Sequence, residues 1–437
     1  MAGEIIRETR SVCPVCLKNL PAALRRDGAG AVTLERTCPE HGTFSVPVWR
    51  GRLDWDAWLG EAERLPAGAA ERCPHDCGLC PEHETDSCCV LLEVTARCNL
   101  RCRFCFARGG GPAEDPPAEE LKAAIRDIAE KCAGPLLQFS GGEPTLRDDL
   151  PELVRCAKEA GCGYTQVNTN GLRLARDPAY ARALKEAGLD IVFLQFDGTR
   201  EEVYETLRGG PLLKEKLEAI RVCGEARLGV TLVPTVVRGV NDGQLGEIVA
   251  LAASLAPAVR AVHFQPVSYF GRYPGVPAGE ERYTLDELMT DLAAQAGIPA
   301  ESFLPSRCDH PLCGFHSSFL IEPGGGLRPL SSITRAPKGR GSARVNREYV
   351  ARRWQRGPET DPPPADLSGE MDFDTFLYRV RNTSLTLSAM AFQDAGNLNL
   401  ERLRRCSLHV YDHGKVLPFC AKYLTPMAPS SAGMPGA

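Results

Sequence analysis

The sequence predicts an α/β protein built on a partial (β/α)6 barrel of the TIM type, and two patterns indicate this. Short runs rich in apolar and β-branched residues recur through the middle of the chain, as buried parallel strands do. Helical patterns separate most of these runs, and this alternation is typical of a parallel sheet with crossover helices. The runs are LLEVTA (91–96), LLQFS (136–140), YTQVNTN (164–170), IVFLQFD (191–197), VTLVPTVV (230–237) and AVHFQPVS (261–268). The helical patterns include AEELKAAIRDIAEKCA, LPELVRCAKEAG, DPAYARALKEAG, LLKEKLEAIRVCGEA and DGQLGEIVALAASLA.

Length, charge and hydropathy narrow the class of protein. With 437 residues and a net charge of -5, the chain lacks the electrostatic footprint of a nucleic-acid-binding protein. Its first residues carry charges and no apolar stretch, and no 18-residue apolar run occurs, so we expect neither a signal peptide nor a transmembrane segment. We therefore expect a cytoplasmic protein. In that setting the 19 cysteines are expected to be metal ligands or catalytic groups rather than disulfides.

Three cysteines follow the first predicted barrel strand. Cys98, Cys102 and Cys105, in CNLRCRFCFA, lie on the loop at the C-terminal end of strand 91–96. Three thiolates at this spacing hold three irons of a 4Fe-4S cube and leave the fourth iron open to a small molecule. A structural zinc prefers four protein ligands, usually in two CxxC pairs, and fits this pattern poorly. We therefore expect an open 4Fe-4S cluster here.

A second motif, SGGEPTL, ends the second predicted strand. Together with CxxxCxxC and the aromatic Phe104 before its last cysteine, it resembles the signature of the radical S-adenosylmethionine (SAM) enzymes. The resemblance implies that SAM chelates the open iron and is cleaved to a 5'-deoxyadenosyl radical, which abstracts hydrogen from a substrate. It also implies that Gly141, Gly142 and Glu143 contact SAM. Glycine suits this role because it lacks a Cβ atom, so its backbone approaches a ligand closely.

Polar side chains at two further strand ends are candidates for binding the same cofactor. Period-two alternation places Asn168 and Asn170 on one face of their strand, and Gln195 and Asp197 on one face of theirs. Active sites of such barrels lie at the C-terminal ends of the strands. We expect Asn168 and Gln195 to bind the methionine carboxylate and the ribose of SAM, the alternative being turn or cap residues satisfied by the chain itself.

The N-terminal region contains a CxxC and, after a gap, a CxxH. Cys13, Cys16, Cys38 and His41 supply four ligands for a tetrahedral mononuclear site that suits zinc or iron, and the spacing does not separate the two metals. The segment VTLERTCPEHGTFSVPVW predicts two short strands around the second pair. We expect a metal-binding ribbon.

Two auxiliary cysteine sets flank the barrel. Upstream, Cys73, Cys77 and Cys80 repeat the four-and-three spacing; Cys88 is the expected fourth ligand of a closed 4Fe-4S cluster, and Cys89 is the alternative. A zinc knuckle is the other interpretation of this set.

Downstream, Cys308, Cys313, Cys406 and Cys420 are expected to converge on a third 4Fe-4S cluster. The alternatives for this set are a zinc site and simple buried thiols.

These motifs divide the chain into four predicted regions. Residues 1–60 form the mononuclear metal ribbon, 61–90 carry the upstream auxiliary cluster, 91–290 form the barrel and 291–437 form a C-terminal auxiliary 4Fe-4S domain. Within the last region, 325–370 is rich in glycine, proline and charge and is expected to be a long flexible excursion or a lid.

Along nearly the whole chain, the order of motifs resembles one radical SAM subfamily. Its members include the archaeal tetraether lipid synthase and relatives described as dihydropterin methylases. The resemblance implies SAM, three 4Fe-4S clusters and a rubredoxin-like mononuclear iron, although His41 stands here where such a site has a fourth cysteine. It also implies a reductant such as ferredoxin or flavodoxin and carbon-carbon bond formation at unactivated carbons.

Three functions follow from this reading. The main expectation is an enzyme that joins lipid alkyl chains, with peripheral contact to a membrane. The alternative is an enzyme that methylates or modifies a small heterocycle such as a dihydropterin. The third is a non-catalytic iron-sulfur electron carrier, against which the GGEP motif argues. A long apolar channel would favour the first, and a compact polar pocket with aromatic stacking would favour the second.

Overall fold

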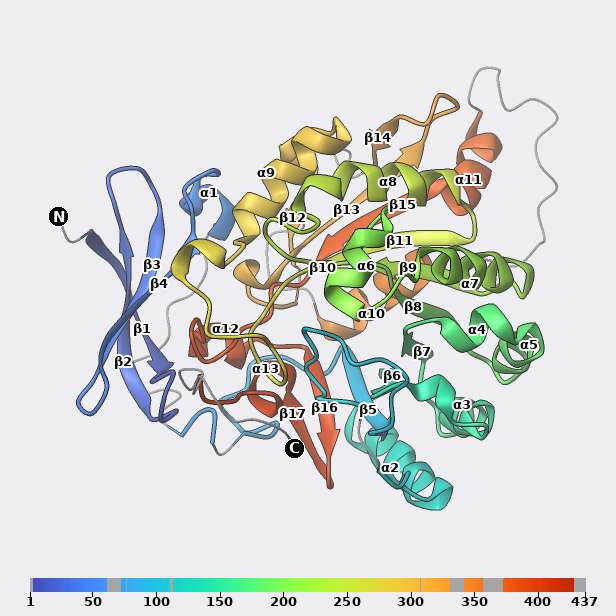
Figure 1. Cartoon of the computed structure of the whole chain (residues 1–437), viewed down its shortest axis with the longest axis horizontal. Coiled ribbons are helices and arrows are strands. Elements are labelled where there is room, and N and C mark those ends of the chain that lie inside the picture. Colours follow the sequence, from blue (N-terminus) through green and yellow to red (C-terminus); the bar gives the residue numbers. More distant parts are fainter. Residues whose placement is uncertain are drawn as a thin grey trace.

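Two sheets organise the described part of the chain (Figure 1): an antiparallel ribbon near the N-terminus and a large mixed sheet that forms the barrel. The computed structural model describes residues 3–60, 72–75, 77–110, 113–306, 308–330, 342–356 and 372–427. The ribbon strands are β1 Glu4–Val12, β2 Asn19–Arg26, β3 Val32–Cys38 and β4 Gly42–Trp49. The two strands predicted around Cys38 are therefore confirmed as β3 and β4.

Six parallel strands form the predicted partial barrel. They pair in the order β5, β6, β7, β8, β9 and β11. Their bounds are β5 Cys89–Thr95, β6 Leu136–Gly141, β7 Tyr164–Thr169, β8 Ile191–Gln195, β9 Gly229–Val233 and β11 Val259–Pro266. Each starts within two residues of its predicted run. Pro234 separates β9 from the short β10 (Thr235–Val236), because proline has no N–H to donate to a ladder. No ladder in the described residues joins the two edges of the sheet, so the barrel is open.

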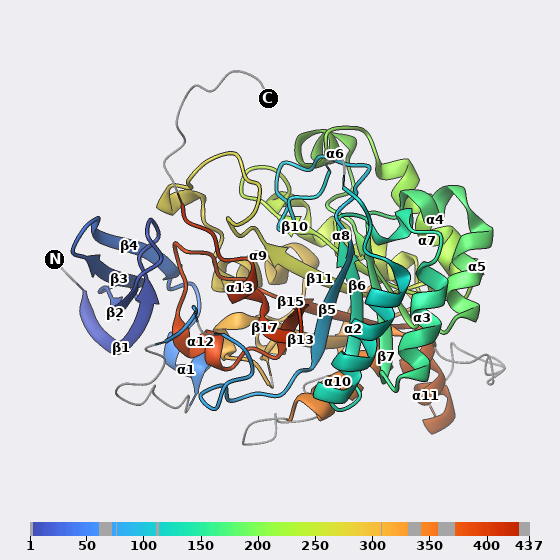
Figure 2. The ribbon, with the colours of Figure 1, turned by 90° about the horizontal axis from the view of Figure 1, so that it is seen from below.

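Helices cover the outer face of this sheet (Figure 2). They are α2 Ala118–Lys131, α3 Leu150–Glu159, α4 Leu172–Arg176, α5 Pro178–Glu186, α6 Glu201–Arg208, α7 Leu213–Glu225 and α8 Leu245–Ser254. Leu121 and Ile125 of α2, four residues apart, are buried in one core with Leu137 and Phe139 of β6. Because strand side chains alternate, Gln138 between them faces the barrel interior. No helix among the described residues combines the length and apolar character needed to cross a bilayer.

The C-terminal segment adds strands to both edges of the barrel sheet. At one edge β15 lies parallel to β11, and β13 pairs with β15 in antiparallel fashion. At the other edge β16 lies parallel to β5 and pairs with β17. The added strands are β12 Leu304–Pro305, β13 Phe315–Ile321, β14 Leu327–Pro329, β15 Ser384–Ala389, β16 Leu408–Asp412 and β17 Lys415–Pro418. The remaining helices are α1 Trp55–Leu59, α9 Leu285–Ala296, α11 Phe373–Asn382, α12 Leu400–Arg404 and α13 Phe419–Lys422. Cysteines in this segment thus lie against the barrel.

A helix occupies part of the segment expected to be a flexible excursion. Within 325–370 the structure describes 325–330 and 342–356, and the rest of the segment lies outside the described residues. Helix α10 (Ala343–Trp354) is capped by Ser342, whose hydroxyl accepts from the N–H of Val345. Trp354 at its end is buried against Phe193 of β8, with ring centroids 5.7 Å apart. The segment expected to be a flexible excursion or a lid therefore contains a packed helix, which composition did not indicate because the packing of Trp354 is not visible in it.

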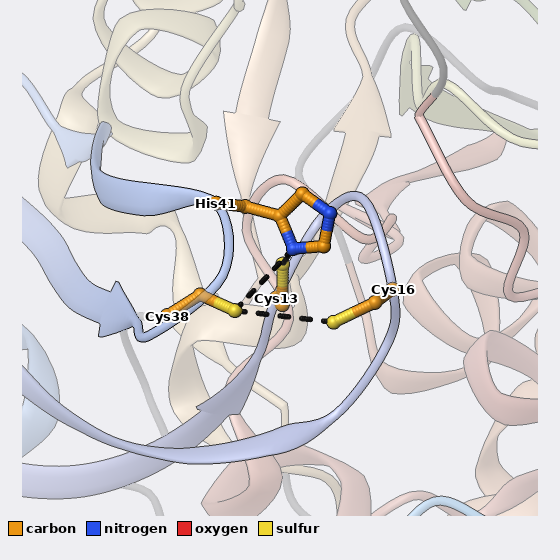
Figure 3. Close-up of side chains that lie close together, drawn as sticks. All are labelled: Cys13, Cys16, Cys38 and His41. Atoms are coloured by element: carbon orange, nitrogen blue, oxygen red, sulfur yellow. Dashed lines mark hydrogen bonds between the residues drawn. The ribbon is translucent and has the colours of Figure 1, made fainter.

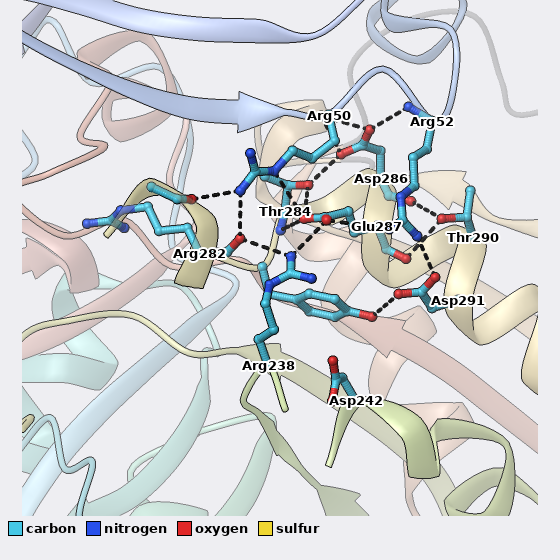
Figure 4. A network of polar contacts seen from close by, with 12 residues as sticks. Arg50, Arg52, Arg238, Asp242, Arg282, Thr284, Asp286, Glu287, Thr290 and Asp291 are labelled. Carbon is cyan, nitrogen blue, oxygen red and sulfur yellow. Dashed lines mark hydrogen bonds and ion pairs between the residues drawn. The ribbon is translucent and has the colours of Figure 1, made fainter. Parts of the chain in front are cut away.

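Helix α9 anchors the ribbon to the barrel (Figure 4). Arg50 and Arg52 follow β4. The backbone N–H of Arg50 donates to both carboxylate oxygens of Asp286, at 3.0 and 3.1 Å, and that of Arg52 donates to one of them at 3.0 Å. The next residue, Glu287, accepts from Arg238 at 2.7 Å and forms an ion pair with Arg50. Asp286 and Glu287, in the first turn of α9, thus accept hydrogen bonds from backbone N–H groups and pair with arginines, and these contacts fix the ribbon beside the barrel.

Candidate active site and metal centres

A cavity of about 310 Å³ lies inside the barrel. Strand β6 lines it with its first residue, Leu136, and its last, Gly141. At about 3.3 Å per residue, the cavity therefore extends over about 17 Å of the strand. The C-terminal strand ends place Cys98, Cys102 and Cys105 at one end of it, as the sequence predicted.

The cysteine loop is held in place by backbone contacts. The side chain of Arg272 donates to the carbonyl of Cys102 at 2.8 Å, and the N–H of Arg272 donates to the carbonyl of Cys105 at 2.9 Å. The N–H of Leu100 points at the Cys98 sulfur, 3.4 Å away. Burial raises the pKa of Cys98 to about 11, so a free thiol here stays protonated at neutral pH. An iron ligand at this position loses that proton on binding.

The two glycines of GGEP form a cradle against this loop. Gly141 has a φ of +121°, a conformation that L side chains rarely adopt. A Cβ on Gly141 would collide with the carbonyl oxygen of Thr95, and one on Gly142 would collide with that of Arg97. The backbone of the glycine pair therefore lies directly beside the cysteine loop and lines the cavity. This close approach fits the 4Fe-4S cluster and SAM implied by the motifs, with Cys98 and its two partners as ligands.

The carboxylate of Glu143 is used by the chain itself. It accepts from the N–H of Thr145 at 3.0 Å, from the hydroxyls of Thr145 and Thr169 at 2.6 Å each, and from the N–H of Asn170 at 2.7 Å. The side chain is only 2% exposed. Glu143 thus ties the GGEP loop to the end of β7, and a contact between its side chain and SAM stays a prediction.

Asn168 and Gln195 both line the cavity near the glycine pair. The amide of Asn168 donates to the hydroxyl of Ser140 at 3.4 Å. Lys216, a fully buried residue of α7, donates to the carbonyl oxygens of Asn170 at 2.6 Å and of the Gln195 side chain at 3.3 Å. Burial lowers the pKa of Lys216 to about 8. The lysine thus holds the oxygen of the Gln195 amide, while SAM binding by Asn168 or Gln195 stays a prediction.

Arg208, the last residue of α6, belongs to the site although nothing in the sequence indicated it. Its guanidinium forms two hydrogen bonds of 2.6 Å with the carboxylate of Asp197, and the two side chains are 4% and 0% exposed. Burial lowers the pKa of Arg208, but the charges and hydrogen bonds of Asp197 and Cys102 together more than offset this, so the pKa is raised overall. The guanidinium also hydrogen-bonds the Cys102 thiol and lines the cavity. The ion pair therefore contacts the cysteine loop through Cys102 and holds the guanidinium in place beside it.

The ribbon brings its four predicted ligands together (Figure 3). The ligand atoms of Cys13, Cys16, Cys38 and His41 all lie within 4.8 Å of one another. The Nδ1 atom of His41 is 3.4 Å from the Cys38 sulfur and 3.7 Å from the Cys13 sulfur. The hydrogen bond from His41 lowers the pKa of Cys38 to about 6. Three sulfurs and one imidazole at these separations fit a tetrahedral zinc site.

The upstream auxiliary set is partly assembled. The thiols of Cys73 and Cys80 lie beside Cys77, whose pKa is raised by its hydrogen bond to Cys73 and by burial. Cys88 instead contacts the thiol of Cys308, which belongs to the other predicted set. The fourth ligand of the upstream set stays a prediction.

Cys89, the alternative fourth ligand, also has a partner in the barrel. Its thiol lies 3.9 Å from the side-chain oxygen of Gln138, which it faces from the first residue of β5.

The downstream set contributes three cysteines to one small cavity of about 20 Å³. Cys313, Cys406 and Cys420 line it together with Asp309. Cys308 points elsewhere, with its sulfur 3.1 Å from the hydroxyl of Ser407. Burial raises the pKa of each of the three lining thiols, to about 12 for Cys420. Asp309 therefore lies beside these three thiols where the sequence predicted Cys308, and a cluster bound by this set stays a prediction.

An aromatic cluster connects these centres to the cysteine loop. The ring of Phe106, next to Cys105, is 5.4 Å from that of Phe419 and 4.9 Å from that of Tyr423. Cys73 and Cys420 are buried in the same cluster. One thiol of each auxiliary set therefore packs with the aromatic rings beside the cysteine loop.

Two family profiles match this chain. The Radical SAM superfamily profile matches residues 92–252, and the HMPTM N-terminal zinc ribbon domain matches residues 5–50. Together with the cysteine loop and the glycine cradle, these matches define a radical SAM enzyme.

Over nearly its whole length, the chain is similar to the 7,8-dihydro-6-hydroxymethylpterin dimethyltransferase of Methanocaldococcus jannaschii. The two are 31% identical over 473 aligned residues, covering 95% of this chain and 92% of that protein. The chain therefore belongs to the family of that protein within the radical SAM superfamily. It is also 30% identical to a GTP 3',8-cyclase of Limosilactobacillus fermentum, over 48% of this chain and 62% of the cyclase.

Solved structures with detectable likeness cover about half of the chain. Streptococcus suis SuiB bound to S-adenosylmethionine has a TM-score of 0.39 and 16% identity, over 48% of each chain. Methylornithine synthase has a TM-score of 0.40 and 17% identity, over 52% of this chain and 66% of that one.

Proposed function

We propose that this radical SAM enzyme methylates or otherwise modifies a small planar heterocycle of the dihydropterin class. The observation that carries the proposal is the similarity to a dihydropterin dimethyltransferase over 95% of the chain. Polar and aromatic side chains in the cavity lining, among them Gln138, Gln166 and Phe193, support it. From the sequence, this function is the alternative to the joining of lipid chains, and the similarity favours the alternative.

The residues of the barrel have distinct tasks in this proposal. When bound, the 4Fe-4S cluster and SAM supply a radical strong enough to abstract hydrogen from an unactivated carbon. Cys98, Cys102 and Cys105 hold the cluster, and the backbone of Gly141 and Gly142 lets SAM approach it. Asn168 and Gln195 orient SAM through their amides. The aromatic wall around Phe106 keeps water from the reacting groups.

We also propose a metal content for the chain. The ribbon binds zinc, since its three thiols and one imidazole fit that metal and the zinc-ribbon profile matches it. The two auxiliary sets each hold a 4Fe-4S cluster. Three cubes then predict about 12 irons and one zinc per chain, whereas a mononuclear iron in the ribbon predicts about 13 irons and no zinc. Metal analysis of the anaerobically reconstituted protein distinguishes the two.

Joining of lipid alkyl chains, the main expectation from the sequence, stays a prediction. A reductant such as ferredoxin or flavodoxin is proposed for either function.

A substrate assay tests the proposed function. The protein is reconstituted anaerobically with iron and sulfide, reduced with dithionite and given methyl-labelled SAM with 7,8-dihydro-6-hydroxymethylpterin or with a diether lipid. We expect 5'-deoxyadenosine in amounts that rise with the pterin, and label in a pterin product. Stimulation by the lipid alone would refute the proposal.

Two single variants provide matched controls for this assay. Cys102→Ala removes a thiol of the cysteine loop and is expected to abolish 5'-deoxyadenosine formation. Cys162→Ala removes a thiol buried in the core outside every metal set, and is expected to retain the activity.

A further inference from the structure

We propose that Gln138 and Gln166 form the site that recognises the heterocycle, by hydrogen bonding to the amino-pyrimidinone edge of the substrate. This inference rests on the proposed function and names the groups that select the substrate. The two residues face each other in register on the neighbouring strands β6 and β7. Both line the cavity, each three residues before the last residue of its strand.

The two amides form a polar pair in a buried place. The side-chain NH₂ of Gln166 donates to the side-chain oxygen of Gln138 at 2.8 Å. Gln166 is 2% exposed and Gln138 is 8% exposed. Because the barrel strands alternate, both point inward while their apolar neighbours face the helices. A buried amide pair costs stability unless its remaining polar atoms find partners.

One of those atoms has no partner in the described part of the chain. The Oε1 oxygen of Gln166 is buried and accepts no hydrogen bond there. If the amide were rotated by 180°, its NH₂ group would occupy this position, and a polar atom would still lack a partner. Native proteins leave few such atoms unpaired. The oxygen has almost no accessible surface in the ligand-free protein, so the Gln166 amide must turn toward the cavity to meet a ligand. A ligand that carries a donor beside an acceptor then satisfies the pair, and the N–H, C=O and amino groups of an amino-pyrimidinone do so.

Aromatic side chains offer stacking surfaces in the same cavity. The ring of Phe193 is 5.7 Å from that of Trp354 with an angle of 24°, and 5.4 Å from that of His263. Burial lowers the pKa of His263 to about 3, so the ring is neutral, and its Nδ1 atom is 2.8 Å from the hydroxyl of Ser388. Flat apolar rings beside a hydrogen-bonding edge are what a planar heterocycle requires.

The charges of the cavity select against phosphorylated ligands. Arg208 is the only lysine or arginine among its described lining residues, and it is paired with Asp197. The carboxylate of Asp309 accepts from the N–H of Ser407 at 2.7 Å. An alkyl chain is disfavoured as well, because it would bury the amide pair without supplying a partner. A neutral heterocycle is the class of ligand that fits.

A binding experiment with the reconstituted holoenzyme tests the inference. Dissociation constants are measured anaerobically, by equilibrium dialysis, for 7,8-dihydro-6-hydroxymethylpterin and for its analogue without the 2-amino group. We expect the wild type to prefer the aminated ligand by about tenfold or more, the usual penalty for leaving buried polar groups of a site unpaired. Gln166→Leu is expected to lose this preference and to bind the pterin about 10- to 100-fold more weakly.

Control variants separate recognition from folding. Gln138→Leu is expected to weaken pterin binding in the same way as Gln166→Leu. Gln244→Leu removes a buried amide whose oxygen accepts from the N–H of Thr199 and which does not line the cavity, so pterin binding should stay within twofold of the wild type. Uncoupled SAM cleavage without pterin should also be unchanged in Gln166→Leu, which shows that the variant is folded and loaded.

Two results overturn the inference, and they are distinguishable. If the wild type binds the pterin and Gln166→Leu binds it equally well with the same preference for the amino group, the assignment of the amide pair is wrong while the proposed function stands. If the wild type binds no pterin at all, the proposed function fails and the inference falls with it.

Discussion

The buried ion pair between Asp197 and Arg208 allows a stability prediction with a definite magnitude. Replacing Asp197 with leucine leaves the guanidinium buried without its counter-ion, since Arg208 is only 4% exposed. Removing one partner of a buried pair costs about 3–5 kcal/mol of unfolding free energy. With an unfolding entropy of about 2.1 cal/mol/K per residue, this lowers the Tm of a cooperatively unfolding chain of this length by about 3–5 °C.

The assay is thermal unfolding of the anaerobically purified protein, followed by circular dichroism. The double variant with leucine at both positions removes both charges, and we expect its Tm to lie above that of Asp197→Leu. Glu218→Leu breaks the solvent-exposed pair with Arg221 and should leave the Tm within measurement error. The reasoning is refuted if Asp197→Leu melts within about 1 °C of the wild type, or if the double variant is no more stable than the single one.

Three further predictions address the glycine cradle, the pH dependence and the ribbon. Gly142→Ala should displace the cysteine loop, because the new Cβ atom would collide with the carbonyl of Arg97, and the rate of SAM cleavage should fall at least tenfold. Gly210 has open space around it, so Gly210→Ala should not change that rate. Burial lowers the pKa of His263 to about 3, whereas the pKa of a histidine in the unfolded chain is about 6.5. The unfolded state therefore binds a proton more readily, and this contribution to the unfolding free energy, complete above pH 6.5, is lost as the pH falls. At pH 5 the loss should be on the order of 2 kcal/mol. His263→Gln should make the decline of denaturant stability between pH 7 and pH 5 shallower, and an unchanged slope would contradict the assignment. Cys38→Ser should remove the ribbon zinc while the iron content stays the same, and a loss of iron with no loss of zinc in metal analysis would contradict zinc binding by the ribbon.

Much of the barrel is visible in the sequence because its strands are short apolar runs between amphipathic helices. The same patterns do not show the edges of the sheet. The sequence of strand β15, SLTLSA, has only a weak apolar pattern. It joins the barrel sheet by pairing with β11, which lies more than a hundred residues earlier in the chain. Helix α10 was missed for a similar reason, since what fixes it is the packing of Trp354 on Phe193.

The candidate site divides in the same way. Ligands with close spacing, such as Cys98 and Cys102, are readable because the chain itself brings them together. Lys216 and Arg208 look like ordinary charges of surface helices, yet both are buried against strand ends. Contacts between distant segments decide such cases, and the approach of Cys88 to Cys308 is another example. Gln166 gives no signal in the sequence beyond being a polar residue in a buried strand.

The central claim is that three thiols hold an iron-sulfur cube whose open iron binds SAM. Electron paramagnetic resonance of the dithionite-reduced, reconstituted protein, recorded with and without SAM, tests it most directly. We predict a 4Fe-4S signal that changes on addition of SAM and that is lost from a variant with alanine at Cys98, Cys102 and Cys105, while the auxiliary signals persist. A spectrum that SAM leaves unchanged, or a SAM-responsive signal that survives in the triple variant, would contradict the claim.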